Sequence, residues 1–394
     1  MSIKINDNNK INLTQPAMNK IWCLLFLASL LSVNALYSQS KGDKYQEILG
    51  KAHDSGLPSI TAIVQSPGEK EWRGKSGVGN IENAIPIDIN QTFRLASISK
   101  IFTSIVILQL VDENKVKLTD SISKYLDAET QTKIPNVNSI TILHLLSHSS
   151  GIYSFTENNR FWKECYLNGG MSRTWRPNEI LRYIENKKPV SKPLEPFSKK
   201  LYSNTNYILL GMIIERITNN TLNMEYQNRI FTPLKMNDTF LEGYDSQGRK
   251  PVDSYVVANS SILRSAVKKK DIQKVNGSHF INLSQEYEQY NSWAWAAGGI
   301  SSNLNDLALF FSAIRNHELL SSETQKVLLL LNSSKDKGIA FFGGTGGSDG
   351  IQATMLHLMP SDVVIIILIN SSGNEKNNLS SVFAELFKIA SNKK

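Results

Sequence analysis

The sequence predicts an α/β (α+β) fold, in which both ends of the chain build one antiparallel sheet and a helical lobe is inserted between its strands. Strand-like segments lie near the N-terminus, at 59–66 and 72–78, and near the C-terminus, at 351–358 and 363–370. The last two are joined by residues 360–362, a Pro-Ser-Asp link typical of a hairpin. Apolar residues between these ends recur with helical spacing. The simplest assembly is therefore one sheet with an inserted lobe.

The predicted elements follow the same order along the chain. A sheet lobe is expected at about 45–95 and about 296–394, with the helical lobe at about 96–295. The first helix of that lobe, Ile101–Val111, carries apolar residues on nearly all faces, which predicts burial on most sides. Further helices are predicted at Ile140–Ser147, Asn178–Ile184 and Tyr207–Ile217, at 302–314 with Ser302 as N-cap, and at 379–389.

Composition and charge place the chain among globular proteins. Of its 394 residues, 41% are hydrophobic and 20% are charged, which is enough for one large core or two joined lobes. The net charge of +8 comes from scattered small groups of basic residues, typical of a solvated surface. A basic face with interleaved aromatic residues is missing from the sequence, so no nucleic-acid partner is expected.

The N-terminal segment 1–38 predicts export. Lys20 precedes an apolar run at 21–33, which has the length of a signal peptide and is short for a membrane span. Small residues at Ala35 and Ser38 offer cleavage points, so the mature domain is expected to be 39–394, periplasmic or secreted. The alternative is an uncleaved membrane anchor. Cleavage would leave Cys165 as the single cysteine, without an intramolecular disulfide.

The pattern Ser-x-x-Lys points to nucleophilic catalysis. On a helix, the two residues share a face, so the lysine amine reaches the serine hydroxyl and can accept its proton. The pattern occurs six times, at Ser38, Ser97, Ser121, Ser265, Ser334 and Ser391. Only Ser97 directly precedes a long apolar helix, which could exclude water from Lys100 and lower its pKa. Ser97 by itself could equally be a structural N-cap.

The segment around Ser97 and four further segments strengthen the case for Ser97. The stretch 92–100, Thr-Phe-Arg-Leu-Ala-Ser-Ile-Ser-Lys, resembles the nucleophile segment of serine beta-lactamases and D-alanyl-D-alanine peptidases, particularly the class C-like group. Residues 140–151 resemble the landmark after the nucleophile helix, and 202–211 resemble the Tyr-x-Asn motif. Residues 297–302, with Asp306 after them, and a glycine-rich strand near the C-terminus complete the resemblance.

The resemblance implies a beta-lactamase-like fold with the active site in the cleft between sheet and helices. It implies that Ser97 is the nucleophile, Lys100 the base, and Tyr202 a second base that passes a proton to the leaving group. Asn204 would donate a hydrogen bond to the acyl-side amide of the substrate. The backbone N–H groups of Ser97 and Gly347 would form the oxyanion hole, worth about 3 kcal/mol per donor.

The third motif departs from the family pattern. The family usually has Lys or His, then Thr or Ser, then Gly, whereas this chain has Gly344-Thr345-Gly346. The missing cation normally binds the terminal carboxylate of the substrate and supports a low pKa of the Tyr/Lys pair. Beta-lactam hydrolysis and carboxypeptidase action are therefore in doubt, and esterases are among the family members with a weakened third motif.

We therefore predict a serine hydrolase that forms an acyl-enzyme on Ser97 and acts on D-alanyl-type peptides, beta-lactams or related amides and esters. A small molecule or a peptidoglycan-like peptide is the expected partner. Two alternatives remain: an esterase on uncharged acyl substrates, and a non-catalytic penicillin-binding or sensor domain. No cofactor is implied. His144 and His148 are four residues apart but lack a third ligand in view, so no metal is expected. The oligomeric state stays open.

Overall fold

A computed structural model describes residues 39–245, 247–257, 272–275, 277–286, 291–336, 339–359, 361–373 and 379–392. The predicted export segment 1–38 lies outside the described residues. Contacts divide the chain into two units, Met1–Lys44 and Tyr45–Lys394, and the description below concerns the second. Within the described ranges, no helix combines the length and the apolar character that crossing a membrane requires.

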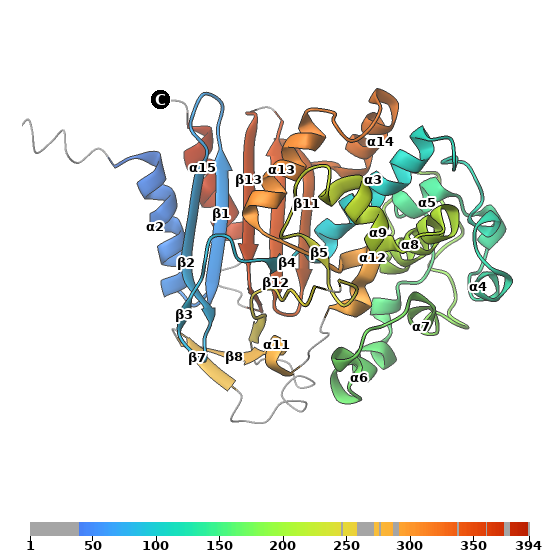
Figure 1. Ribbon diagram of the computed structural model, residues 1–394, viewed down its shortest axis with the longest axis horizontal. Coiled ribbons are helices and arrows are strands. Elements are labelled where there is room, and N and C mark those ends of the chain that lie inside the picture. The colour runs from blue at the N-terminus through green and yellow to red at the C-terminus, as the bar shows by residue number, and fades with distance from the viewer. Residues whose placement is uncertain are drawn as a thin grey trace, which may run out of the picture. The chain divides into compact units, whose positions relative to one another are not determined.

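The main sheet has seven strands in the spatial order β10-β11-β12-β13-β1-β2-β3, all paired antiparallel (Figure 1). Its central strands come from both ends of the chain, because β1 pairs with β13 from Ile60↔Ile369 to Gln65↔Val364. The strand bounds are β1 Ser59–Gln65, β2 Trp72–Asn80, β3 Ile85–Pro86, β10 Ser333–Asp336, β11 Ile339–Ser348, β12 Ile351–Leu358 and β13 Val363–Ile369.

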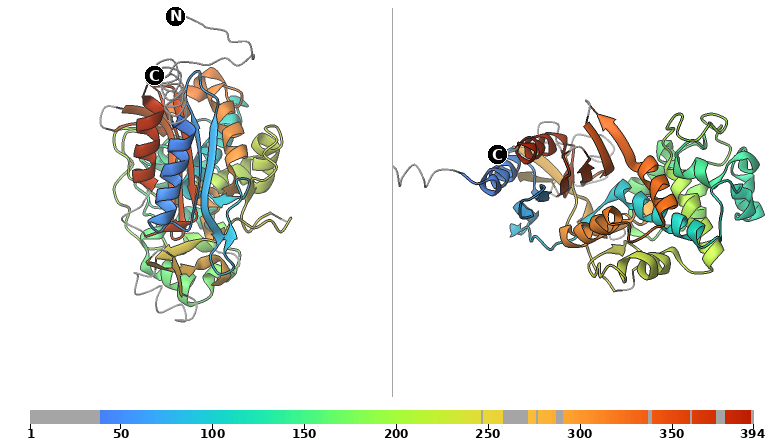
Figure 2. Two further views of the ribbon diagram at one scale, coloured as in Figure 1. Left: turned by 90° about the vertical axis from the view of Figure 1, so that its left-hand side faces the viewer. Right: turned by 90° about the horizontal axis from the view of Figure 1, so that it is seen from above.

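Both faces of this sheet are covered, which is why β13 is apolar at every position. All seven residues of β13 are buried. Ile365 and Ile367 pack in one cluster with α15 (Leu379–Ser391) and with the Tyr45–Asp54 part of α2 (Lys41–Asp54). The two helices run side by side over that face (Figure 2). Ile366 and Leu368 point to the opposite face, where α13 (Leu304–Arg315) packs.

The helical region lies beside the β11 side of the sheet (Figure 1). Its centre is α3 (Ser99–Asp112), which is buried along most of its length and contacts α8, α12 and α14. This agrees with the predicted burial of Ile101–Val111. The remaining helices are α4 Ala128–Thr132, α5 Ile142–Leu146, α6 Asn159–Leu167, α7 Pro177–Leu181, α8 Asn204–Thr218, α9 Leu222–Tyr226, α11 Leu283–Glu286, α12 Trp295–Gly298 and α14 Ser322–Asn332.

The predicted fold class, an antiparallel sheet with terminal helices and a helical region, is confirmed. The lobe predicted at about 96–295 as helical, which the prediction took to contain helices alone, also contains strands, because two small sheets draw strands from it. One has the order β4-β9-β5 and the other β14-β6-β8-β7. Their bounds are β4 Phe93–Arg94, β5 Phe240–Leu241, β6 Tyr255–Val257, β7 Ile272–Val275, β8 Ser278–Asn282, β9 Ile300–Ser302 and β14 Ser371–Ser372.

The predicted helix starts also need one correction. Ser302 does not cap α13, because it is the last residue of β9 and pairs with Phe93. Asn303 takes the cap, and its side chain accepts a hydrogen bond from the backbone N–H of Asp306. Asparagine and serine are similar N-caps, so the sequence alone does not separate adjacent candidates. The strand pairing of Ser302 decides between them.

Candidate active site

Ser97 lies on a short 3-10 turn, Ala96–Ile98, between β4 and α3. Ala96 has a φ of +45°, in the left-handed region that costs a residue with a Cβ about 1 kcal/mol or more. Such strained residues persist only where their surroundings fix them, and they cluster at functional sites. Here the left-handed conformation of Ala96 turns the backbone just before Ser97, and the chain then continues into α3.

Strand β11 supports this turn from behind. Beyond Phe342, β11 no longer pairs with β10, so its free edge runs past the Ser97 turn. A Cβ added to Gly346 would lie 2.0 Å from the carbonyl oxygen of Leu95 and 3.1 Å from the backbone nitrogen of Ser97. Only glycine permits this approach. Gly346 therefore holds the strand against the nucleophile segment.

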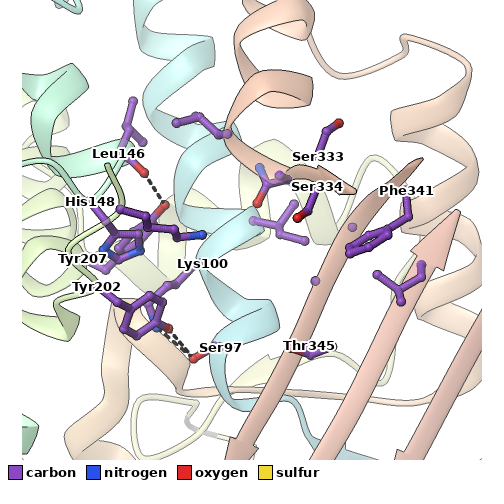
Figure 3. A pocket seen from close by; sticks show the side chains of 17 residues that line it. Ser97, Lys100, Leu146, His148, Tyr202, Tyr207, Ser333, Ser334, Phe341 and Thr345 are labelled. Carbon is purple, nitrogen blue, oxygen red and sulfur yellow. Dashed lines mark hydrogen bonds between the residues drawn. The ribbon is translucent and has the colours of Figure 1, made fainter. Parts of the chain in front are cut away.

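Three side chains form a hydrogen-bonded cluster at the turn (Figure 3). The Oγ atom of Ser97 lies 2.7 Å from the hydroxyl oxygen of Tyr202, and the Nζ atom of Lys100 donates to the same Oγ over 3.1 Å. Lys100 comes from the first turn of α3, whereas Tyr202 comes from the loop before α8. The structure thus brings together the three residues that the sequence predicted as catalytic.

Lys100 is buried, at 5% exposure, and its Nζ atom also donates to the carbonyl oxygen of Ala297 over 2.5 Å. No carboxylate pairs with it among the described residues. Burial lowers the pKa of Lys100 well below its ordinary value, and the charge of Lys200 adds to the effect. Trp295, at a φ of +36°, begins the short helix that presents the Ala297 carbonyl. The lowered pKa and the hydrogen bond to Ser97 Oγ are what a proton acceptor at this position requires.

Tyr202 is held by the ring of His148. The two rings stack with their centroids 4.3 Å apart, and His148 Nδ1 accepts a hydrogen bond from the backbone N–H of Ser203. Burial lowers the pKa of His148 well below its usual range, so this ring is neutral at pH 7. His148 lies beyond α5, with a φ of +55°.

The pKa of Tyr202 runs against the expectation of a lowered value. Partial burial raises it, and this outweighs the lowering by the Ser97 hydrogen bond and by the Lys200 charge. Tyr202 is consequently a neutral phenol that can donate or relay a proton. The geometry favours Lys100 as the base.

The structure places the remaining predicted residues nearby with different surroundings. Asn204 begins α8, and its Nδ2 atom donates to Thr156 Oγ1 over 3.0 Å. Gly344 and Thr345 line the cavity described below. Gly347 follows Gly346 on β11, in register with Gln352 of β12. The oxyanion role of Gly347 and the substrate role of Asn204 stay predictions.

A cavity of about 300 Å³ opens beside Ser97. One wall is formed by α3 and by the loop before α8, which contains Lys200. The other wall is formed by β10 and by β11, and Gly344 and Thr345 of β11 face the cavity. Figure 3 shows Thr345 on its strand, across the cavity from Ser97. Both regions of the fold therefore contribute walls.

Two of these wall residues were not assigned a role from the sequence. His148 belongs to the 140–151 landmark. In the sequence, its spacing to His144 was considered only for metal binding, and no metal was expected. Instead, His144 Nδ1 lies 2.7 Å from Thr141 Oγ1, at the start of α5, and no metal-binding group occurs among the described residues. Lys200 lies two residues before Tyr202. Side chains two apart in an extended segment face the same way, which could have indicated it.

These features, a serine hydroxyl hydrogen-bonded to a buried lysine and to a tyrosine beside a cavity, are those of a serine hydrolase. The profile of the Beta-lactamase family matches residues 43–381, and the chain belongs to that family. The match covers the sheet, the helical region and every predicted site residue.

Individual relatives are more distant. Protein flp of Staphylococcus aureus (strain COL) is 26% identical over 320 residues, and the match covers 74% of this chain and 60% of that protein. The chain thus corresponds to about three fifths of the length of that relative. Teichoic acid D-alanine hydrolase of Staphylococcus aureus is 23% identical over 89% of this chain and 79% of its own length. The crystal structure of a D-stereospecific amidohydrolase from Streptomyces sp. superposes with a TM-score of 0.67 at 25% identity, covering 86% and 98% of the two chains.

Proposed function

We propose that this protein hydrolyses esters or amides of D-amino acids, with D-alanyl compounds as the leading class, through an acyl-enzyme on Ser97. The observation that carries the proposal is the buried Lys100, hydrogen-bonded to Ser97 Oγ and to the Ala297 carbonyl without a carboxylate partner in the described part of the chain. A lysine whose pKa is lowered by burial can take the proton of the serine hydroxyl when its amine is neutral. Two relatives, a teichoic acid D-alanine hydrolase and a D-stereospecific amidohydrolase, support the D-aminoacyl class.

The geometry supports a two-step acyl transfer. Ser97 Oγ attacks the substrate carbonyl carbon while its proton passes to Lys100, and the negative charge forms on the carbonyl oxygen. The tetrahedral intermediate then collapses: the carbonyl re-forms, the bond to the leaving group breaks, and the leaving oxygen or nitrogen receives a proton through the Tyr202 hydroxyl. Water then attacks the carbonyl carbon of the ester on Ser97 while one of its protons passes to the same pair. The second tetrahedral intermediate collapses, the bond to Ser97 Oγ breaks, Oγ takes the proton back, and the D-amino acid is released.

Intact mass spectrometry tests the first half of this proposal. The native protein is treated with a fluorophosphonate probe and, separately, with a penicillin. We expect a stable adduct with the fluorophosphonate that Ser97→Ala lacks. A penicillin adduct would show that beta-lactams also enter the site. Labelling by neither reagent would refute the hydrolase and favour a binding or sensor domain.

Steady-state kinetics test the second half. Matched D-alanyl and L-alanyl esters of the same alcohol are compared, with a butyryl ester as the uncharged acyl substrate. We expect kcat/KM for the D-alanyl ester to exceed that for the L-alanyl ester by about tenfold or more, since one misplaced group in a shaped pocket costs about that much. Equal rates for all three esters would instead identify an unspecific esterase.

A further inference from the structure

Lys200 lines the same cavity as Ser97, and it is exposed there. Its Nζ atom lies 6.0 Å from the centroid of the Tyr202 ring, so the two side chains lie on one wall. Lys200 has no ion-pair or hydrogen-bond partner within the described ranges. The charge of Lys200 acts to lower the pKa of Lys100, His148 and Tyr202, in each case as a smaller effect than burial.

The cavity walls hold no acidic side chain among the described residues. Two of their three basic side chains, Lys100 and His148, are buried. Lys200 is the one basic wall residue of the described structure that is exposed. A cavity with an accessible lysine and no acidic wall residue is complementary to an anion.

The wall opposite Lys200 leaves open space in the cavity. At Gly344, where the family pattern has a cation, an added Cβ would meet only the Cδ1 atom of Ile101, at 3.4 Å. The space that a long third-motif side chain would fill is open. An anion in this space can approach Lys200 from the β11 side.

We propose that Lys200 is a specificity-determining residue that binds an anionic group, a carboxylate or a phosphate, on the leaving-group side of the substrate. The inference rests on the proposed function. In the proposed function, the leaving group receives its proton through the Tyr202 hydroxyl and so lies next to Tyr202. Lys200 lies on the same wall of the cavity as Tyr202, so it faces the leaving-group side. The positive charge that the third motif lacks is thus supplied from the loop before α8.

Two matched substrate pairs test this proposal. In each pair, the leaving group of a D-alanyl ester either carries an anionic group or lacks it. The pairs are D-alanyl-glycerol phosphate against D-alanyl-glycerol, and D-alanyl-D-lactate against its methyl amide. We expect the native protein to prefer the anionic member of at least one pair by about tenfold in kcat/KM, the size of one charged hydrogen bond. Which pair shows the preference distinguishes phosphate from carboxylate.

Lys200→Met is the decisive variant and Lys199→Met is its matched control, because Lys199 is the exposed neighbour that does not line the cavity. We expect Lys200→Met to abolish the preference and Lys199→Met to retain it. The ratio within a pair is the readout, because any effect of the mutation on the base Lys100 changes both members equally.

The outcomes separate this inference from the proposed function. Hydrolysis of both members of each pair at rates within threefold of each other in the native protein would overturn the role of Lys200 and leave the D-aminoacyl hydrolase standing. A native preference that survives Lys200→Met would also overturn it. Hydrolysis of none of the four esters would instead refute the proposed function itself.

Discussion

Ser97 and Ser121 each precede a lysine by three positions, yet their surroundings differ completely. Ser97 Oγ bonds to Lys100 and Tyr202 beside a cavity. Ser121 caps a short 3-10 turn, where its Oγ accepts from the backbone N–H of Ser123. The first arrangement is the one that activation of a hydroxyl requires, whereas the second stabilises a backbone turn.

We therefore expect Ser97→Ala to abolish labelling by a fluorophosphonate, and Ser121→Ala to leave labelling intact. Loss of the Ser121 cap should cost about 1 kcal/mol of unfolding free energy. Intact mass spectrometry and thermal unfolding measure the two effects. A Ser97→Ala protein that still forms the adduct would place the nucleophile elsewhere.

Lys100 and Tyr202 act on the same oxygen atom, so each should matter for acylation. We expect Lys100→Met and Tyr202→Phe each to lower the acylation rate by about a hundredfold or more, the usual size of a general acid–base contribution. Stopped-flow acylation with a chromogenic D-alanyl ester measures this, and circular dichroism controls for folding. Acylation near the native rate in both variants would contradict the shared role.

The lowered pKa of Lys100 gives the activity a direction with pH. Lys100 accepts a proton only when it is neutral, so kcat/KM should rise as the pH increases through its lowered pKa. Lys200, His148, Tyr202 and Tyr207 face the same amine. Of these, the Lys200 charge lowers the Lys100 pKa, so Lys200→Met should raise that pKa.

The acid limb of the kcat/KM profile should accordingly move to higher pH in Lys200→Met. The neutral D-alanyl-glycerol ester is the substrate for this measurement, because it avoids any charge on the leaving group. Lys199→Met serves as control and should keep the native limb. An acid limb at the same pH in native and Lys200→Met proteins would show that Lys200 does not act on the base.

At the scale of elements, β11 connects the sheet to the nucleophile through its glycines, which differ in what they permit. Gly346 packs on the backbone of the Ser97 turn, whereas Gly344 faces the cavity. The sequence showed only a glycine-rich run. The difference depends on which edge of β11 meets the turn, and that is a property of the assembled fold.

We expect Gly346→Ala to lower the acylation rate at least tenfold and to destabilise the protein by about 1–3 kcal/mol, because its Cβ would overlap the Leu95 carbonyl and force the backbone apart. Gly344→Ala on the same strand is the matched control. Its Cβ meets only an ordinary contact, so both quantities should stay near native. Equal effects of the two substitutions would contradict the close approach of β11.

The comparison of elements also shows what the sequence could predict. Strands such as β13 and helices such as α3 were predictable, because their apolar patterns match burial on both sides. Strands β5 and β6 were not, because they are short and pair with the distant strands β9 and β14. The same limit applies to the site. Ser97, Lys100 and Tyr202 lie in recognisable motifs, whereas the contribution of Lys200 depends on the fold of its loop.

At the scale of the whole molecule, helix α2 follows the predicted export segment 1–38 along the chain. Helix α2 starts at Lys41, and Ser40 caps it: the Ser40 Oγ atom accepts from the backbone N–H of Asp43, and the Asp43 carboxylate accepts from Ser40 in return. A mature chain that starts before Ser40 keeps this cap, whereas one that starts at Lys41 loses it. The predicted mature domain, 39–394, therefore retains this cap.

We expect export to remove the N-terminal segment and to leave a mature chain that starts before Ser40. N-terminal sequencing of protein recovered from the envelope or medium of a bacterial host tests this, with a cytoplasmic preparation as control. A chain that starts at Gln39 should match the activity of the exported protein, and one that starts at Lys41 should be less stable by about 1 kcal/mol, the value of an N-cap. Recovery of residues 1–35 on the exported protein would contradict cleavage and favour a membrane anchor.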